Sequence, residues 1–154
     1  MADEPEGFGE QDLDLRARRR EARRTQTYAL FLKDFRERSG LPRERVEKAL
    51  VSVLCALEQR LVKGEADDLR AQLPMKLQEA LQACNPQREK PLWKFGLDEY
   101  LQMVAEDLGG DKALAESITR AAFATVRAHI TEGEAEQVGH ELPADLRALW
   151  ARPI

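Results

Sequence analysis

The chain has 154 residues, of which 43% are hydrophobic and 34% are charged, and its formal net charge is −4 at pH 7. The low aromatic content (6%) and the abundance of Ala, Leu, Glu, Arg and Gln exclude a sheet-rich protein and predict an all-α fold in one domain or two packed halves. The segment after Met1 has no secretory signal pattern, and the longest apolar stretch, 49–57, is far shorter than a membrane span. We therefore expect a cytoplasmic protein without a transmembrane helix.

The first 27 residues combine an acidic tail with an arginine-rich segment. Residues 1–11 are poor in apolar side chains and rich in Gly, Pro and acidic residues, which predicts disorder. Six arginines follow within nine residues: Arg16, Arg18, Arg19, Arg20, Arg23 and Arg24. Offset only by Glu21, they give this segment a charge of +5 and leave −9 on the rest of the chain. We interpret residues 12–27 as a basic arm, either helical or loose, on an acidic body.

Four helices are predicted over residues 28–81. Apolar residues at positions 28, 31, 32 and 35 have the spacing of one helix face, and Gly40 is expected to end this helix. A second helix begins at Pro42 and carries a wide apolar stripe, and we expect Gly64 to end it with a positive φ. A short acidic helix follows. The step from Leu73 to Pro74 then starts the fourth helix.

The same pattern returns over residues 97–150, after a predicted linker at 82–96 that contains Asn85, Pro86 and Pro91, which favour turns and interrupt helices. When residue n is aligned with residue n+69, ten of 54 pairs are identical without a gap. The pairs are Leu32/Leu101, Glu37/Glu106, Gly40/Gly109, Glu47/Glu116, Gly64/Gly133, Glu65/Glu134, Ala66/Ala135, Leu73/Leu142, Pro74/Pro143 and Leu77/Leu146. The sequence therefore predicts two tandem four-helix repeats, 28–81 and 97–150, packed about a pseudo-twofold axis as one domain, 28–150.

The repeated segment has the form G-E-A-[DE]-x-[LV]-x-x-x-L-P-x-x-L and occurs at 64–77 and 133–146. With these two copies, an opening helix containing FLKDF at 31–35 and an ending LPADLRALW at 142–150, the chain resembles a bacterial helical family known as a domain of unknown function. The resemblance covers residues 28–150. It implies a cytoplasmic helical domain of two repeats and supplies no activity, cofactor or catalytic residue.

Repeated acidic residues are the first candidate site. Glu65, Asp67, Glu134 and Glu136 could converge near the pseudo-twofold axis, where carboxylates would suit a hard cation or an acid–base pair. Glu136 and His140, one turn apart, could also share a metal. The structural alternative is that acidic residues at helix N-termini interact favourably with the helix dipole. Because no phosphate-binding loop or nucleophile motif appears, the sequence points to no catalytic residue and no cofactor.

The basic arm is the second candidate site. The charge asymmetry favours a non-catalytic helical interaction module that contacts a protein partner through the arm. An anionic membrane is another possible partner, and the structural alternative is a solvated helix extension or a contact between the arm and the acidic body. Nucleic-acid binding is one alternative, because arginine also binds phosphates, although the arm has no interleaved aromatic residues for base stacking. The other alternative is a small-ligand or metal site between the repeats, which could be enzymatic. The sequence leaves the partner's identity and the oligomeric state open.

Overall fold

The computed structural model describes residues 4–83 and 95–151, with side chains described from residue 12 onward. Within these residues all regular secondary structure is helical, which confirms the predicted all-α class. The helices are α1 (Glu4–Ser39), α2 (Arg43–Arg60), α3 (Lys63–Ala71), α4 (Met75–Leu81), α5 (Leu97–Leu108), α6 (Lys112–His129), α7 (Glu132–Glu141) and α8 (Ala144–Ala151). Most of the predicted linker, 84–94, lies outside the described residues.

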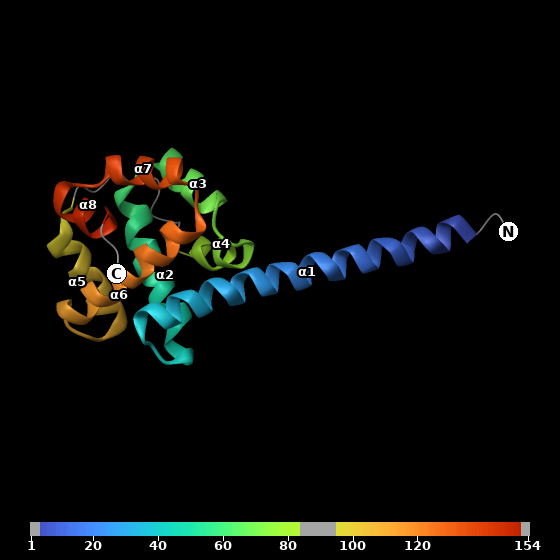
Figure 1. Ribbon diagram of the computed structural model, residues 1–154, viewed down its shortest axis with the longest axis horizontal. Helices are drawn as coiled ribbons and strands as arrows, with labels where there is room; N and C mark the ends of the chain where they lie inside the picture. The colour runs from blue at the N-terminus through green and yellow to red at the C-terminus, as the bar shows by residue number, and fades with distance from the viewer. Residues whose placement is uncertain (1–3, 84–94, 152–154) are drawn as a thin grey trace.

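Helix α1 is much longer than the first core helix that the sequence predicts. It begins at Glu4 and so includes the arm at 12–27 and most of the segment for which composition predicts disorder. Ion pairs one turn apart support the helix here: Arg16 contacts Asp12 at 2.9 Å and Arg18 contacts Asp14 at 3.1 Å. Figure 1 shows the N-terminal part of α1 extending away from the other helices. The arm is therefore an extension of the first helix.

The glycines that were expected to end helices divide into two kinds. Gly40 (φ 73°) and Gly109 (φ 71°) follow α1 and α5 in the left-handed conformation, as expected. Gly64 and Gly133 were expected to end α2 and α6, and this prediction is wrong. Those helices end at extended residues, and each glycine is the second residue of the next helix. Each of these glycines therefore lies next to a helix boundary, but it belongs to the helix that begins there and not to the helix that ends.

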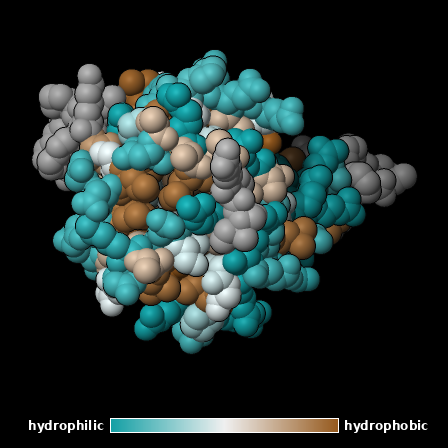
Figure 2. All heavy atoms as spheres, turned by 60° about the vertical axis from the view of Figure 1, so that its left-hand side comes forward, coloured by the Kyte–Doolittle hydropathy of each residue, from teal (hydrophilic) through white to brown (hydrophobic). Residues whose placement is uncertain are grey.

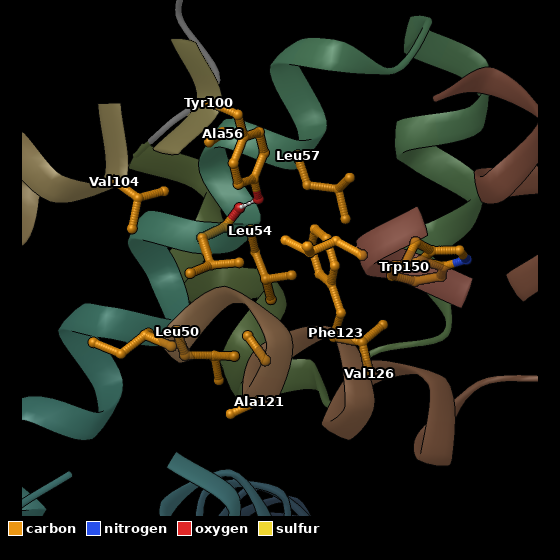
Figure 3. Close-up of a cluster of buried hydrophobic side chains, with 14 of the residues drawn as sticks. Leu50, Leu54, Ala56, Leu57, Tyr100, Val104, Ala121, Phe123, Val126 and Trp150 are labelled. Carbon is orange, nitrogen blue, oxygen red and sulfur yellow. Dashed lines mark hydrogen bonds between the residues drawn. The ribbon is translucent and has the colours of Figure 1, made fainter. Parts of the chain in front are cut away.

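Helices α2 and α6 form the centre of the hydrophobic core. Leu50, Leu54 and Leu57 of α2 lie opposite Phe123 and Val126 of α6, and all five are almost completely buried (Figure 3). Because apolar area removed from water is the main favourable term in folding, this pair of helices anchors the domain.

Tyr100 joins α5 to this centre. It is fully buried, and its hydroxyl donates a hydrogen bond of 2.6 Å to the carbonyl oxygen of Val53 on α2 (Figure 3). Burial raises the pKa of the Tyr100 phenol, because the charged form would lose its hydration.

The helices pack across the two halves of the chain rather than only within each half. Helix α1 packs on α6, and α5 packs on α2, while α2 contacts α6 and α3 contacts α7. The helix bounds also recur: Arg43 and Lys112 begin α2 and α6 and are 69 positions apart, as are Arg60 and His129, which end them. The first helix of each half therefore completes the core of the other.

The surface carries mainly hydrophilic residues on the face shown in Figure 2, with hydrophobic residues in small patches between them. Among the described helices, none combines the length and the apolar character that crossing a membrane requires.

Candidate functional site

Three acidic side chains meet where α3 packs against α7. Glu65, Asp68 and Glu134 each place one carboxylate oxygen within 4.8 Å of the other two. Glu65 is 8% exposed and Glu134 is 9% exposed, whereas Asp68 lies at the surface. We call these three residues the acidic cluster. Carboxylates are rarely buried without a partner, so this arrangement requires a physical explanation.

The position of the two glutamates within their helices explains how they come to face each other. Each is the third residue of its helix, where a glutamate commonly turns back to accept a hydrogen bond from the N-cap backbone. Here the far end of the opposite helix takes that role. The Val62 N–H donates to Glu141 Oε1 at 3.0 Å, and the Thr131 N–H donates to Gln72 Oε1 at 2.9 Å.

These exchanged caps leave Glu65 and Glu134 free of their usual local function. The exchange also requires the two helices to run in opposite directions, because the start of each meets the end of the other. The two carboxylates consequently point toward each other across the α3–α7 contact.

The electrostatic environment of the acidic cluster is negative. Burial raises the pKa of Glu65 to about 8, with further contributions from a hydrogen bond to Glu134 and from the charges of Glu134 and Asp68. Among the residues that the structure describes, one oxygen of each buried glutamate, Oε1 of Glu65 and Oε2 of Glu134, has no hydrogen-bond partner. A buried acceptor without a donor is costly, so the cluster has unused capacity to bind a proton or a cation.

The structure brings together some of the acidic residues that the sequence singled out. Glu65 and Glu134 meet, as the repeat alignment suggested. Asp67 instead forms an exposed ion pair with Lys63 at 3.0 Å, and Glu136 and His140 are exposed and are not part of the acidic cluster. Of the four repeated carboxylates that could converge, only Glu65 and Glu134 therefore lie together.

Asp68 is the member of the cluster that sequence reasoning missed. The repeat alignment pairs it with Gln137, so a search for repeated acids passes over it. The signal that could have found it is local: Asp68 lies three residues after Glu65, on the same face of a helix.

The arginines of the arm are the second candidate site. Arg16, Arg19, Arg20, Arg23 and Arg24 have the spacing i, i+3, i+4, i+7 and i+8, which places them along one stripe of α1. All six arm arginines are exposed. Within the described residues Arg19, Arg20 and Arg23 form no ion pair. Their charges are therefore available to another molecule.

The base of the arm borders a hollow of about 400 Å³ on the body. Arg20, Arg23 and Arg24 line it from α1, and His129 lines it from the end of α6. Glu21 forms an ion pair with Lys76 of α4, which holds α1 against the body at this point. The hydrogen bond from Lys76 lowers the pKa of Glu21. The arm thus continues outward from a fixed base.

Comparison with protein families places most of the chain in a single match. The model of the family described as Uncharacterized conserved protein (DUF2267) matches residues 28–149. The matched range contains the acidic cluster and excludes the arm. A comparison with curated proteins finds no match.

Proposed function

The chain belongs to the DUF2267 family of uncharacterized conserved proteins, and we propose that it is a non-catalytic, cytoplasmic helical interaction module. In this proposal the basic arm, residues 12–27, binds an acidic surface of a protein partner, and the helical body is the scaffold that holds the arm. The observation that carries the proposal is a projecting helix whose exposed arginines have few partners within the chain (Figure 1).

Charge and geometry both support this use of the arm. A helix that projects from the body lacks the tertiary packing that usually stabilises helices. In the arm, two ion pairs between residues one turn apart provide part of the missing stabilisation. A stripe of arginines presents forked donors that match carboxylates well. The arm carries positive charge where the remainder of the chain is acidic, so it attracts an acidic partner at a distance from the body.

The apolar residues of the arm favour a protein over a nucleic acid as the partner. Leu13 is 62% exposed and Leu15 is 47% exposed, and such side chains gain more from a protein surface than from phosphates. The arm has no aromatic residue between positions 12 and 27 on which a base could stack. The acidic body would also repel a long polyanion lying across it.

The scaffold in this proposal is a pair of four-helix repeats related by a pseudo-twofold axis. Exchange of the two halves interchanges the α1–α6 contact with the α5–α2 contact and returns the α2–α6 and α3–α7 contacts to themselves. The exchanged caps obey the same operation, because Val62 corresponds to Thr131 and Gln72 corresponds to Glu141 at an offset of 69. This symmetry supports a rigid helical body. The arm is the one element that has no counterpart under the symmetry.

Binding of defined anionic probes tests the role of the arm. We would measure fluorescence anisotropy of a labelled glutamate-rich peptide, a DNA duplex and a single-stranded RNA of comparable charge, each at two salt concentrations. The arm variant carries Arg16→Gln, Arg19→Gln and Arg23→Gln. The matched control carries Arg36→Gln, Arg43→Gln and Arg45→Gln, which remove the same charge from exposed positions at the other end of the helical body.

We expect the peptide to bind the unmodified chain and the control alike, and to bind the arm variant about tenfold more weakly, as the loss of three exposed ion pairs predicts. The higher salt concentration should weaken binding of the peptide to the unmodified chain and to both variants. Tighter binding of DNA or RNA than of the peptide would favour the nucleic-acid alternative. Equal loss in the arm variant and the control, or no binding at all, would contradict the proposal.

A further inference from the structure

We propose that Glu65, Asp68 and Glu134 form a binding site for a divalent cation that prefers oxygen ligands, held where α3 packs against α7. This site lies in the helical body and is independent of the arm. The class of ion is one such as Ca²⁺, Mg²⁺ or Mn²⁺, because all three side chains are carboxylates.

The first argument is the distance between the oxygens. Two ligand atoms on opposite sides of a bound calcium ion are about 5 Å apart, and closer when they are neighbours in the coordination shell. The three carboxylate oxygens of the acidic cluster lie within 4.8 Å of one another. Rotation of the side chains, without movement of either helix, is therefore enough to bring one oxygen of each residue to a single ion.

The second argument is that the two buried carboxylates have no capping role and, among the described residues, no hydrogen bond beyond the one between them. Their caps are supplied by Glu141 and Gln72, so neither Glu65 nor Glu134 is needed to terminate its helix. Each has a buried oxygen that accepts no hydrogen bond from the described part of the chain. Nearby cations are engaged elsewhere, with Lys63 on Asp67 and Arg70 on Glu58.

The third argument is charge balance. A bound cation requires all three carboxylates to be ionised, which gives a charge of −3, and a divalent ion reduces this charge to −1. The starts of α3 and α7 each contribute roughly +0.5, because helix N-termini carry partial positive charge. Together the ion and the helix ends bring the site close to neutrality, which the burial of Glu65 and Glu134 requires.

Asp68 gives the site a path to solvent. It is exposed whereas the two glutamates are buried, so an ion can be bound first at Asp68 and then reach the inner carboxylates. The exposed side also leaves room for water molecules, which hard cations usually keep as part of their coordination shell. The site would thus be part protein and part water.

Titration of the full chain with Mn²⁺ tests this proposal, because the electron paramagnetic resonance signal of the free ion disappears on binding. The site variants are Glu65→Gln and Glu134→Gln, each of which keeps the shape of the side chain and removes a ligand charge. The control variants are Asp67→Asn and Glu136→Gln. These remove an equal charge from exposed acids on the same two helices, outside the acidic cluster.

We expect the unmodified chain to bind one Mn²⁺, which excess Ca²⁺ or Mg²⁺ displaces. Each site variant should bind Mn²⁺ at least about tenfold more weakly, and each control variant should bind it as the unmodified chain does. Thermal unfolding provides an independent measurement. The ion should raise the melting temperature of the unmodified chain and not that of Glu65→Gln. Without the ion, Glu65→Gln should melt higher than the unmodified chain, because it removes one of two facing buried acids.

Three results would overturn the proposal. The first is the absence of Mn²⁺ binding up to millimolar concentration. The second is binding that Glu65→Gln and Glu134→Gln leave intact, which would place the ion elsewhere. The third is equal weakening in the site and control variants, which would indicate a general attraction of cations to an acidic surface.

Discussion

Glycines at corresponding positions of the two halves fall into two physical classes at the scale of single residues. Gly40 and Gly109 have positive φ, which costs an L-residue about 1 to 2 kcal/mol. Gly64 and Gly133 lie in the first turns of α3 and α7, and a Cβ added at either would meet no atom within 4 Å. At these two sites alanine would only improve the helix propensity, by up to about 1 kcal/mol.

We therefore predict opposite effects of one substitution. Gly40→Ala or Gly109→Ala should lower the free energy of unfolding by about 1 to 2 kcal/mol. Gly64→Ala or Gly133→Ala should leave it unchanged or raise it by up to about 1 kcal/mol. Urea unfolding followed by circular dichroism measures both. Destabilisation of Gly64→Ala to the same extent as Gly40→Ala would show that the assignment of the two classes is wrong.

An ion pair joins two elements, α2 and α3, inside the first half. Arg70 donates to both carboxylate oxygens of Glu58, one of them from Nε at 2.9 Å, and Glu58 is 4% exposed. This pair raises the pKa of the Arg70 guanidinium, chiefly through the hydrogen bond to Glu58. Removing the arginine would leave a buried carboxylate without this partner, which is more costly than removing both groups.

We predict that Arg70→Met lowers the free energy of unfolding by about 3 kcal/mol, and that adding Glu58→Leu restores most of the loss. Chemical denaturation of the two single variants and the double variant measures the coupling. Lys112→Met, which removes an exposed pair with Asp98, is the control and should cost less than about 1 kcal/mol. Two additive losses in the double variant would contradict the prediction.

The residues 69 positions after this ion pair are of different types. Gly139 corresponds to Arg70 and Arg127 corresponds to Glu58, so no such ion pair can form. Instead the ring of Trp150 occupies this region: its Nε1 donates to Ala135 O at 2.8 Å, and the Arg127 guanidinium lies 5.6 Å from the ring centroid. An added Cβ at Gly139 would come within 3.3 Å of Trp150. An ion pair therefore joins α2 to α3, whereas the ring of Trp150 joins α8 to α6 and α7.

Local chemistry predicted the elements well and their mutual contacts poorly. Pro74 stands directly before α4, and Gly40 follows α1, because proline and glycine act on the backbone close to them. The prediction for Gly64 was wrong, because a glycine between two helices does not indicate which of the two it belongs to. The repeat suggested Glu65 and Glu134 but not Asp68, and the caps supplied by Glu141 and Gln72 depend on tertiary packing that periodicity does not contain.

At the scale of the whole molecule, contact between α1 and α6 leads us to expect a single cooperative unit. Phe31 of α1 is fully buried, and its ring centroid lies 4.8 Å from that of His129 at the end of α6. His129 in turn approaches Asp34 of α1, with 3.1 Å between Nε2 and Oδ2. Loss of this contact should loosen both halves together.

We predict that Phe31→Ala lowers the free energy of unfolding by about 3 to 5 kcal/mol. The adjacent Leu30 is 56% exposed, so Leu30→Ala is the control and should cost less than about 1 kcal/mol. Thermal unfolding followed by far-ultraviolet circular dichroism and by tryptophan fluorescence should give a single shared transition for each variant. Separate transitions of the two probes would show that the halves unfold independently.

The distance in sequence between α1 and α6 has a consequence for synthesis on the ribosome. Phe31 and His129 are 98 positions apart, and translation adds roughly 5 to 20 residues per second. Phe31 and Phe35 are therefore made about 5 to 20 seconds before the end of α6, which is one of the helices that α1 packs against. During this interval the nascent chain presents an unsatisfied apolar face next to its basic arm. Chaperones, or a partner that recognises the arm, can meet this segment before the body exists.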